Sequence, residues 1–290
     1  MKWAEISIEA EPASEDAVAD MLLDAGCAGT AAQTFHEVVR VFGYLPVDDR
    51  LESLLCSIRE RVRSLPALGL PLHSTQVGVK LVSDEDWTTA YRSFFKPIRV
   101  GRVVVSPSWS RDGLVEESDD VIVEIDPGMA FGTGHHETTR LCLEALQDRP
   151  IGGETVLDVG TGSGILGIAA AKLGAARVVG VEIDPAAADI AAENVRRNGL
   201  AGLVTILVGD SPLVFDGTAD LVLANILPDV IIAMADALTA KTNPGGRLIT
   251  SGIVTERLDD VRAALESHGV ATVEEKREGD WVALVSEKRT

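Results

Sequence analysis

A glycine-rich loop between an apolar strand and a helical run is the part of this chain best suited to chemistry. Residues 155–159 form an apolar run that carries one acidic residue, and residues 165–173 read as a helix. Between them, glycine stands at every second position, as Gly160, Gly162 and Gly164. Glycine lets a ligand approach the backbone closely at the start of a helix. The pattern predicts a ligand site at a strand–loop–helix junction.

Polar residues also follow the next three strand-like runs. Glu182 comes about 20 residues after the glycine loop, where nucleoside-binding α/β units carry an acidic residue for the ribose hydroxyls. Asp210 follows the third strand, near where an adenine amino group would lie, and Asn225 ends the fourth. Each alone could be an exposed strand end or a turn. Ligands of open α/β sheets bind outside the carboxyl ends of the strands, so the set together predicts a nucleoside site.

The glycine spacing and the end of the chain both bear on the class of fold. The alternating glycines differ from the dinucleotide pattern G-x-G-x-x-G and resemble motif I of class I S-adenosylmethionine-dependent methyltransferases. Residues 271–276 and 281–286 read as strands joined by a short turn, which predicts a hairpin. A nicotinamide dehydrogenase would instead continue with parallel units or a second domain. The expected fold is α/β, with a Rossmann-like seven-stranded sheet that ends in an antiparallel hairpin.

Asn225 is the candidate catalytic residue. Class I enzymes that methylate nitrogen often carry Asn or Asp followed by Pro-Pro-aromatic at this strand end, whereas residues 225–228 are Asn-Ile-Leu-Pro. The amide oxygen can accept a hydrogen bond from an attacking amine and aim its lone pair. The missing aromatic disfavours a planar base as acceptor and favours an aliphatic amine. A lysine amine, with a pKa of about 10.4 in water, must first lose its proton, which partial desolvation assists.

A second polar cluster lies at residues 126–139. Its glycines and threonines predict a ligand-covering loop over residues 131–139, with Thr133 inside the loop as a candidate cofactor contact. Thr139 opens the next helix, near the expected position of the methionine carboxylate. The His-His-Glu triplet at 135–137 lacks the spacing of a helical H-E-x-x-H pair and has no evident third distant ligand, so no metal is expected.

Charge restricts the possible partners. The formal net charge of the 290-residue chain is −19. Phosphate contacts need a basic surface, so direct nucleic-acid binding is not expected. The charge suits a basic protein substrate, although it also serves solubility alone.

The remaining composition indicates a cytoplasmic globular protein. Hydrophobic residues make up 46% of the chain, enough for a sizeable core. No uncharged apolar run reaches about 18 residues, and the N-terminus lacks a signal-peptide pattern, so no membrane partner is expected. Cys27, Cys56 and Cys142 show no metal-ligand or redox spacing. Each is expected to be a small buried hydrophobe in a reducing cytosol.

Periodicity divides the chain into two domains and a linker. Residues 1–82 alternate strands 2–8, 38–44 and 74–82 with helices 13–25 and 48–65, which predicts a small ferredoxin-like α+β domain for substrate recognition. Residues 83–98 read as the linker. Residues 99–290 are the α/β domain, with expected strands 121–125, 155–159, 177–183, 204–208, 220–225, 247–250, 271–276 and 281–286, and expected helices 138–147, 165–173, 185–198, 229–241 and 256–267.

Three motifs together resemble one bacterial family. The run Pro-Gly-Met-Ala-Phe-Gly-Thr-Gly-His-His-Glu-Thr-Thr-Arg at 127–140, the glycine loop at 157–166 and Ala-Asn-Ile-Leu at 224–227 are similar to the PrmA-type ribosomal protein methyltransferases. The tryptophan motifs at 86–87, 107–109 and 281–285 fit the same family. The resemblance covers nearly the whole chain, more loosely before residue 83.

The resemblance carries specific expectations. Members of this family transfer methyl groups from S-adenosyl-L-methionine to protein eleven of the large ribosomal subunit, on its N-terminal α-amine and lysine ε-amines, up to trimethylation. Their N-terminal domain recognises the substrate, and a flexible linker lets the catalytic domain reach several amines. The matching cofactor contacts here are Thr139, Gly160, Glu182 and Asn225, with Phe131 over the cofactor or along the substrate channel. Many members carry Asp at the position of Glu182.

Three other functions can be compared with this one. A lysine methyltransferase for a different basic protein would share all these motifs and differ only in its acceptor. A cofactor-binding module without catalysis would be expected to lose Asn225 or the glycine loop, and both are intact. A dehydrogenase is disfavoured by the glycine spacing and the terminal hairpin.

Overall fold

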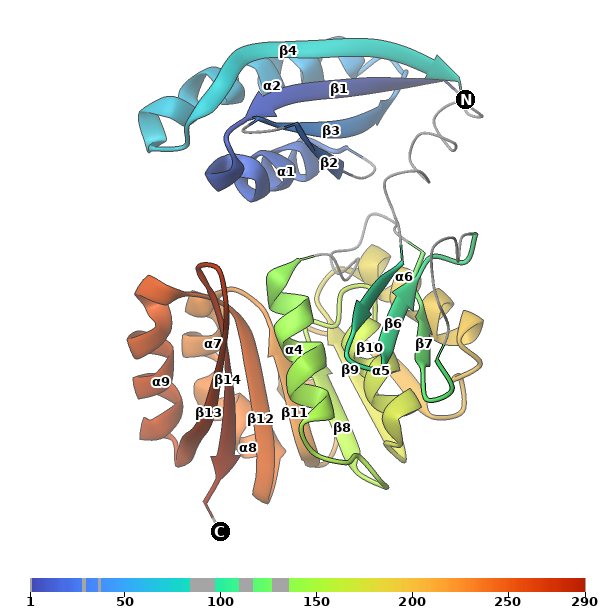
Figure 1. Ribbon diagram of the computed structural model, residues 1–290, viewed down its shortest axis with the longest axis vertical. Coiled ribbons are helices and arrows are strands. Elements are labelled where there is room, and N and C mark those ends of the chain that lie inside the picture. Colours follow the sequence, from blue (N-terminus) through green and yellow to red (C-terminus); the bar gives the residue numbers. More distant parts are fainter. Residues whose placement is uncertain are drawn as a thin grey trace. The chain divides into compact units, whose positions relative to one another are not determined.

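The chain forms two compact units, Met1–Lys96 and Pro97–Thr290 (Figure 1). A computed structural model describes residues 2–27, 30–35, 38–83, 97–109, 117–126 and 136–289. The predicted linker at 83–98 therefore lies almost entirely outside the described residues. No helix in the described part is both long and apolar enough to cross a membrane.

The first unit is a four-stranded antiparallel sheet with two helices. The sheet has the order β2-β3-β1-β4, which with the helices gives the expected ferredoxin-like arrangement. Ala4, Ile6 and Ile8 are fully buried on one face of β1, and this face packs against both helices. The elements of this unit are β1 (Lys2–Ala10), α1 (Glu15–Asp24), β2 (Thr30–Phe35), β3 (Val38–Pro46), α2 (Leu51–Ser64) and β4 (Leu72–Ser83).

The second unit contains a seven-stranded sheet of order β10-β9-β8-β11-β12-β14-β13. Neighbours from β10 to β12 are parallel, whereas β14 runs antiparallel to both β12 and β13, so the predicted terminal hairpin is confirmed. The strands are β8 (Thr155–Val159), β9 (Arg177–Glu182), β10 (Val204–Val208), β11 (Ala219–Asn225), β12 (Thr242–Val254), β13 (Val270–Glu278) and β14 (Trp281–Lys288).

Helices cover both faces of this sheet (Figure 1). Val156 of β8 belongs to one apolar cluster and the next residue, Leu157, to the other. The central strands are therefore buried on both sides, which explains their continuous apolar sequence. The helices of the first layer are α4 (Glu137–Gln147), α5 (Ile165–Leu173) and α6 (Pro185–Arg197), and those of the second are α7 (Pro228–Ala233), α8 (Ala235–Lys241) and α9 (Leu258–Ser267).

The structure contains three strands that were not expected from the sequence, β2, β5 (Ile98–Val100) and β6 (Val103–Ser106). In the first unit, β2 has a weak pattern of alanine and polar residues and forms an edge strand through pairing with β3. In the second unit, β5, β6 and β7 (Val121–Glu124) form a small separate sheet, of which only β7 was expected. Strands of three or four residues carry too little periodicity to be recognised.

Two expected elements also differ from the structure. The single helix expected at 229–241 is two helices, α7 and α8, which meet at Met234 because its backbone leaves the helical conformation. The strand expected at 247–250 runs from Thr242 to Val254. Residues 243–246, Asn-Pro-Gly-Gly, lie inside this strand, where the pairing with β11 jumps from Thr242 to Arg247.

The cysteine expectation holds for two of three residues. Cys27 and Cys142 are buried, and burial raises the pKa of each thiol to about 12. Cys56 is exposed on α2, so the expectation of a buried side chain is wrong there. Cys56 follows the buried Leu55 by one helical position, which turns its side chain away from the core.

Candidate active site

Four of the predicted site residues lie at or just after the ends of neighbouring parallel strands, namely Gly160, Glu182, Asp210 and Asn225. In the sheet, Val208 of β10 pairs with Glu182 of β9, and Val159 of β8 pairs with both Val181 and Ala224. Gly160 directly follows Val159 at the end of β8, and Asn225 directly follows Ala224 in β11. The strand pairing thus brings Gly160, Glu182 and Asn225 to one edge of the sheet, as the order of the strand ends predicted.

The glycine loop turns tightly onto β9. The backbone N–H groups of Gly160 and Thr161 both donate to the carbonyl of Val181, at 2.9 and 3.0 Å. Gly160, Gly162 and Gly164 have φ values of +69°, +55° and +85°, a region that favours glycine. Gly164 is the N-cap of α5. The loop therefore presents bare backbone at the start of a helix.

Replacing Gly160 by alanine is expected to destabilise the protein by about 2–3 kcal/mol. The new Cβ would lie 2.4 Å from Cγ2 of Ile226, in addition to the strain of a positive φ. Gly199→Ala is the matched control, because Gly199 has φ of +72° and open space around its Cβ position. Urea unfolding should give a loss of only about 1 kcal/mol for this control. Equal losses in the two variants would refute the close fit against Ile226.

Asp158 fixes the glycine loop through side-chain hydrogen bonds. Its side chain is 1% exposed, and one carboxylate oxygen accepts from Thr161 Oγ1 at 2.6 Å and from the Gly167 N–H at 3.0 Å. Burial raises the pKa of Asp158 to about 6, because desolvation outweighs these two hydrogen bonds and the nearby Glu182 charge adds to it. Asp158 was not among the site residues expected from the sequence, although an acidic residue in an apolar strand was the available signal.

Asp158 should make stability depend on pH between its ordinary pKa of 3.8 and about 6. The folded state binds this proton more tightly than the unfolded state, so stability falls as pH rises through this window. Asp158→Asn keeps an acceptor oxygen but cannot ionise. In urea unfolding, the free energy of unfolding of the variant minus that of the wild type should increase by ~1.5 kcal/mol between about pH 5 and about pH 7.5. A constant difference across this range would contradict the raised pKa.

Glu182 joins the glycine loop to the loop after β9. Its Oε2 accepts from the Gly162 N–H at 2.9 Å, and its Oε1 accepts from the N–H groups of Ile183 and Asp184 at 2.9 and 3.1 Å. A carboxylate has about four acceptor positions, so one remains open on Oε2. The residue is 8% exposed. This fixed carboxylate is suited to accept a hydrogen bond from a ribose hydroxyl.

The amide nitrogen of Asn225 forms a hydrogen bond that fixes the orientation of its side chain. Its Nδ2 donates to Oγ1 of the fully buried Thr139 at 3.3 Å. Within the described part of the chain, its Oδ1 has no hydrogen-bond partner. The arrangement leaves an acceptor oxygen open at the edge of the sheet, as an attacking amine requires.

The start of α4 is fixed against the terminal hairpin. The side chain of His136 caps the helix by accepting from the Thr138 N–H at 3.2 Å, and its ring meets the Trp281 ring edge-on at 4.9 Å between centroids. Arg140 binds Glu278 of β13 through two nitrogens. The N-terminus of α4, which carries Thr139, is thereby held beside Asn225, where it can receive a carboxylate.

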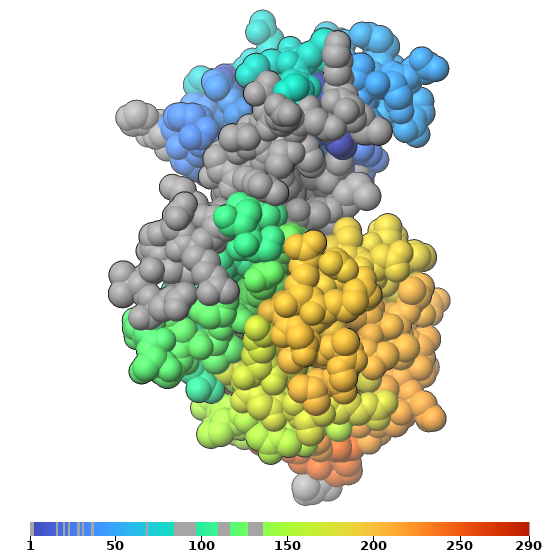
Figure 2. Space-filling model, turned by 90° about the vertical axis from the view of Figure 1, so that its right-hand side faces the viewer, coloured from blue at the N-terminus to red at the C-terminus, as the bar shows by residue number. Residues whose placement is uncertain are grey.

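Exposed aliphatic side chains lie beside the polar groups. Ile183, directly after Glu182, is 68% exposed, and Val208 at the end of β10 is 56% exposed. Figure 2 shows the second unit from a side on which residues 185–220 are visible in yellow to orange. Asp210 follows Val208 by two residues and is exposed. Ile183 was not among the expected site residues, although an isoleucine after a strand-ending acid was a usable signal, and its exposed side chain is suited to contact a flat apolar group.

Two expected contacts cannot be placed. Phe131 and Thr133 lie outside the described residues, as does most of the expected covering loop at 131–139. The expectations for both residues therefore stay predictions.

The chemistry of these groups fits S-adenosylmethionine. An open carboxylate position on Glu182 suits a ribose hydroxyl, exposed Ile183 suits an adenine face, and bare backbone at Gly160 allows close approach of the amino-acid part. A mostly parallel sheet with a terminal hairpin, carrying such a nucleoside site at its carboxyl edge, defines a class I methyltransferase.

Comparison with known proteins gives the family. The model of the ribosomal protein L11 methyltransferase (PrmA) family matches residues 2–289. The chain is 42% identical over 310 aligned positions to the ribosomal protein L11 methyltransferase of Pelotomaculum thermopropionicum, covering 99% of each. It is 43% identical over 300 positions to that of Geobacter metallireducens, covering 98% of this chain and 97% of the relative. The chain therefore belongs to the ribosomal protein L11 methyltransferase (PrmA) family.

A solved structure agrees with this assignment. The ribosomal protein L11 methylase of Lactobacillus delbrueckii subsp. bulgaricus superposes with a TM-score of 0.63 at 32% identity, covering 68% of this chain and all of that chain. The predicted family, the fold class and an S-adenosylmethionine-dependent protein methyltransferase are confirmed. The roles of the individual site residues and the domain limits stay predictions.

Proposed function

We propose that this enzyme transfers methyl groups from S-adenosylmethionine to the N-terminal α-amine and lysine ε-amines of protein L11 of the large ribosomal subunit, up to trimethylation. The relatives that match nearly the whole chain carry this protein in their names. The observation in the site that supports an amine acceptor is the open Oδ1 of Asn225, whose Nδ2 is bound to Thr139. The net charge of −19 suits a basic substrate.

Different residues of the site bind the cofactor and orient the amine for in-line methyl transfer. Bound S-adenosylmethionine supplies an electrophilic methyl group. Glu182 and the loop from Gly160 to Gly164 hold the nucleoside and amino-acid parts, and the N-terminus of α4 receives the carboxylate. Asn225 Oδ1 accepts a hydrogen bond from a neutral amine that still carries an N–H, in the first and second transfers, and so directs its lone pair toward the methyl carbon. The N–C bond forms as the S–C bond breaks, S-adenosylhomocysteine leaves, and the methylated ammonium loses a proton to water before the next transfer. The dimethylated amine has no N–H, so its position in the third transfer depends on the surrounding groups alone. The surroundings must also give a partly methylated amine room to rotate between turnovers.

The first unit is proposed to bind the substrate protein. It carries no cluster of groups that resembles a second reaction centre within its described residues. A linker between the units would let the second unit reach several amines on one bound molecule. We place the reaction in the cytoplasm on free L11, before ribosome assembly, without direct contact to nucleic acid or membrane.

The proposal is tested by comparing acceptors. Purified enzyme with radiolabelled S-adenosylmethionine should label free L11 and leave other basic proteins of similar size unlabelled. Equal or stronger labelling of another basic protein would favour the alternative, a lysine methyltransferase with a different acceptor. Labelling of assembled large subunits at the rate of free L11 would contradict the order of events proposed here.

A further inference from the structure

An irregular segment of β4 forms a hollow against α2 in the first unit. Ile8 of β1 pairs with Val77, and Ala10 pairs with Leu72, so two steps along β1 correspond to five along β4. The extra residues bulge from this edge strand of the sheet. Such bulges redirect side chains and often lie next to functional sites.

The lining of this hollow donates hydrogen bonds and contains no acid. The hollow measures about 320 Å³ and is lined by Arg59 and Arg63 from α2 and by Thr75, Gln76 and Val77 from β4. Two guanidinium groups, a hydroxyl and an amide can all donate to an oxyanion. No lining side chain carries a negative charge to compete with a bound anion.

The two arginines have no ion-pair partner among the described residues. Neighbouring arginines of the same helix region do have partners, because Arg50 pairs with Asp48 at 2.7 Å and Arg61 with Asp24 at 3.2 Å. Arg59 and Arg63 are four residues apart, so both lie on one side of the helix and repel each other. Glu60 is the nearest acid in sequence, but it neither lines the hollow nor forms an ion pair with Arg63.

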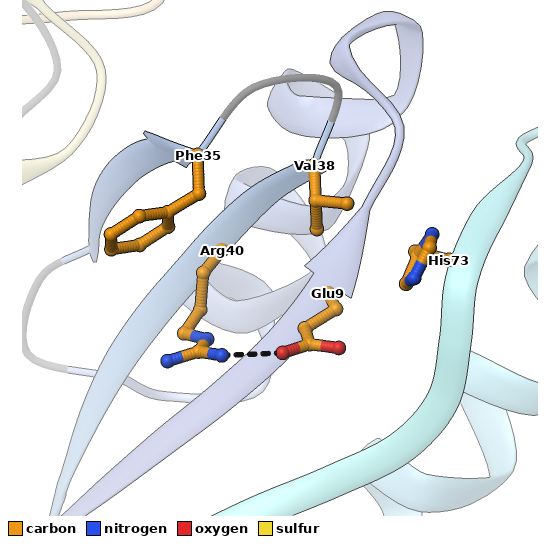
Figure 3. A pocket seen from close by; sticks show the side chains of 5 residues that line it. All are labelled: Glu9, Phe35, Val38, Arg40 and His73. Atoms are coloured by element: carbon orange, nitrogen blue, oxygen red, sulfur yellow. Dashed lines mark hydrogen bonds and ion pairs between the residues drawn. The ribbon is translucent and has the colours of Figure 1, made fainter.

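A second hollow on the same unit shows the contrast. It measures about 270 Å³ and is lined by Glu9, Phe35, Val38, Arg40 and His73 (Figure 3). There Arg40 binds Glu9 at 2.5 Å and lies 5.6 Å from the centre of the Phe35 ring, so its charge is already compensated. Of these two hollows, the one lined by Arg59 and Arg63 therefore carries positive charge that no ion pair among the described residues compensates.

We infer that the hollow between α2 and β4 binds the phosphate group of a small ligand, a function separate from methyl transfer. Arginine forks match the oxygens of phosphate, and two of them can hold a dianion from two sides. A small ligand fits better than nucleic acid, because the chain as a whole carries a charge of −19 and repels a polyanion. Free phosphate and a nucleotide phosphate offer the same chemistry.

Calorimetric titration of the full chain tests this site. Inorganic phosphate and pyrophosphate serve as probes, with S-adenosylhomocysteine present to fill the cofactor site and potassium chloride to match ionic strength. Saturable binding is expected, with Kd of about 1 mM or lower for at least one probe. Arg59→Gln and Arg63→Gln should each weaken it about tenfold or more, and Arg59→Lys by less, since lysine keeps the charge without the fork.

Arg50→Gln is the matched control, because it removes the same charge from the start of the same helix and should leave phosphate binding unchanged. A wild-type protein that does not saturate, or equal affinity in all variants, would overturn the inference. A nucleoside monophosphate that binds more tightly than free phosphate would identify a nucleotide as the source of the group. A short RNA that binds tenfold more tightly than pyrophosphate, with loss in the same variants, would overturn the assignment to a small ligand.

Discussion

Replacing Asn225 by alanine should lower the rate of methyl transfer about 100-fold or more. The variant loses the oxygen that is open to the amine, whereas Glu182 and the glycine loop keep their contacts with each other. Affinity for S-adenosylmethionine should therefore change only a few-fold. Single-turnover labelling of L11, with calorimetric cofactor binding beside it, measures the two effects separately.

Asn243→Ala is the control for this substitution. Asn243 lies near the start of β12, at the opposite end of the sheet, and binds Asp220. Its loss should affect stability and leave the rate near that of the wild type. Asn225→Asp keeps an acceptor oxygen and should retain more activity than the alanine variant. Full activity of Asn225→Ala would remove Asn225 from the mechanism.

Glu182→Gln should weaken cofactor binding about 30- to 100-fold. Both carboxylate oxygens accept backbone N–H groups, Oε2 from Gly162 and Oε1 from Ile183 and Asp184. The glutamine amide nitrogen would replace one of these oxygens, and the N–H groups facing it would lose their acceptor. The variant also removes the charge that strengthens a bond to a ribose hydroxyl. Calorimetry with S-adenosylhomocysteine gives the change in Kd, and kcat at saturating cofactor should fall much less.

Glu193→Gln provides the comparison for Glu182. Glu193 lies on the surface of α6 and binds Arg196, so its loss should leave cofactor affinity unchanged. If Glu182→Gln bound S-adenosylhomocysteine as tightly as Glu193→Gln, the proposed ribose contact would be wrong.

The central elements of the fold could be predicted because their sequence patterns are strong. β8 and β9 are apolar and end at glycine or acid, and Asp184-Pro185 marks the start of α6 with an N-cap and a proline. The edge strand β2 could not be predicted, because its six residues are mostly small or polar and the strand depends on pairing with β3. The break at Met234, where α7 ends and α8 begins, is not visible in the helical pattern of residues 229–241.

The sequence predicts which site residues lie close together, but not the hydrogen bonds that they form. The ends of successive parallel strands must meet, so Gly160, Glu182 and Asn225 could be grouped before the structure was known. The clamp of Asp158 on Thr161 and Gly167, and the three N–H groups on Glu182, depend on how the loop closes in space. Sequence spacing does not encode these contacts.

The central claim is that this enzyme methylates amines of L11, and intact-protein mass spectrometry tests it most directly. Unmethylated L11 incubated with the enzyme and S-adenosylmethionine should gain mass in steps of one methyl group, located by fragmentation to the N-terminus or to lysines. No gain in mass, while calorimetry shows that the same preparation binds the cofactor, would contradict the proposed acceptor and leave the methyltransferase fold in place.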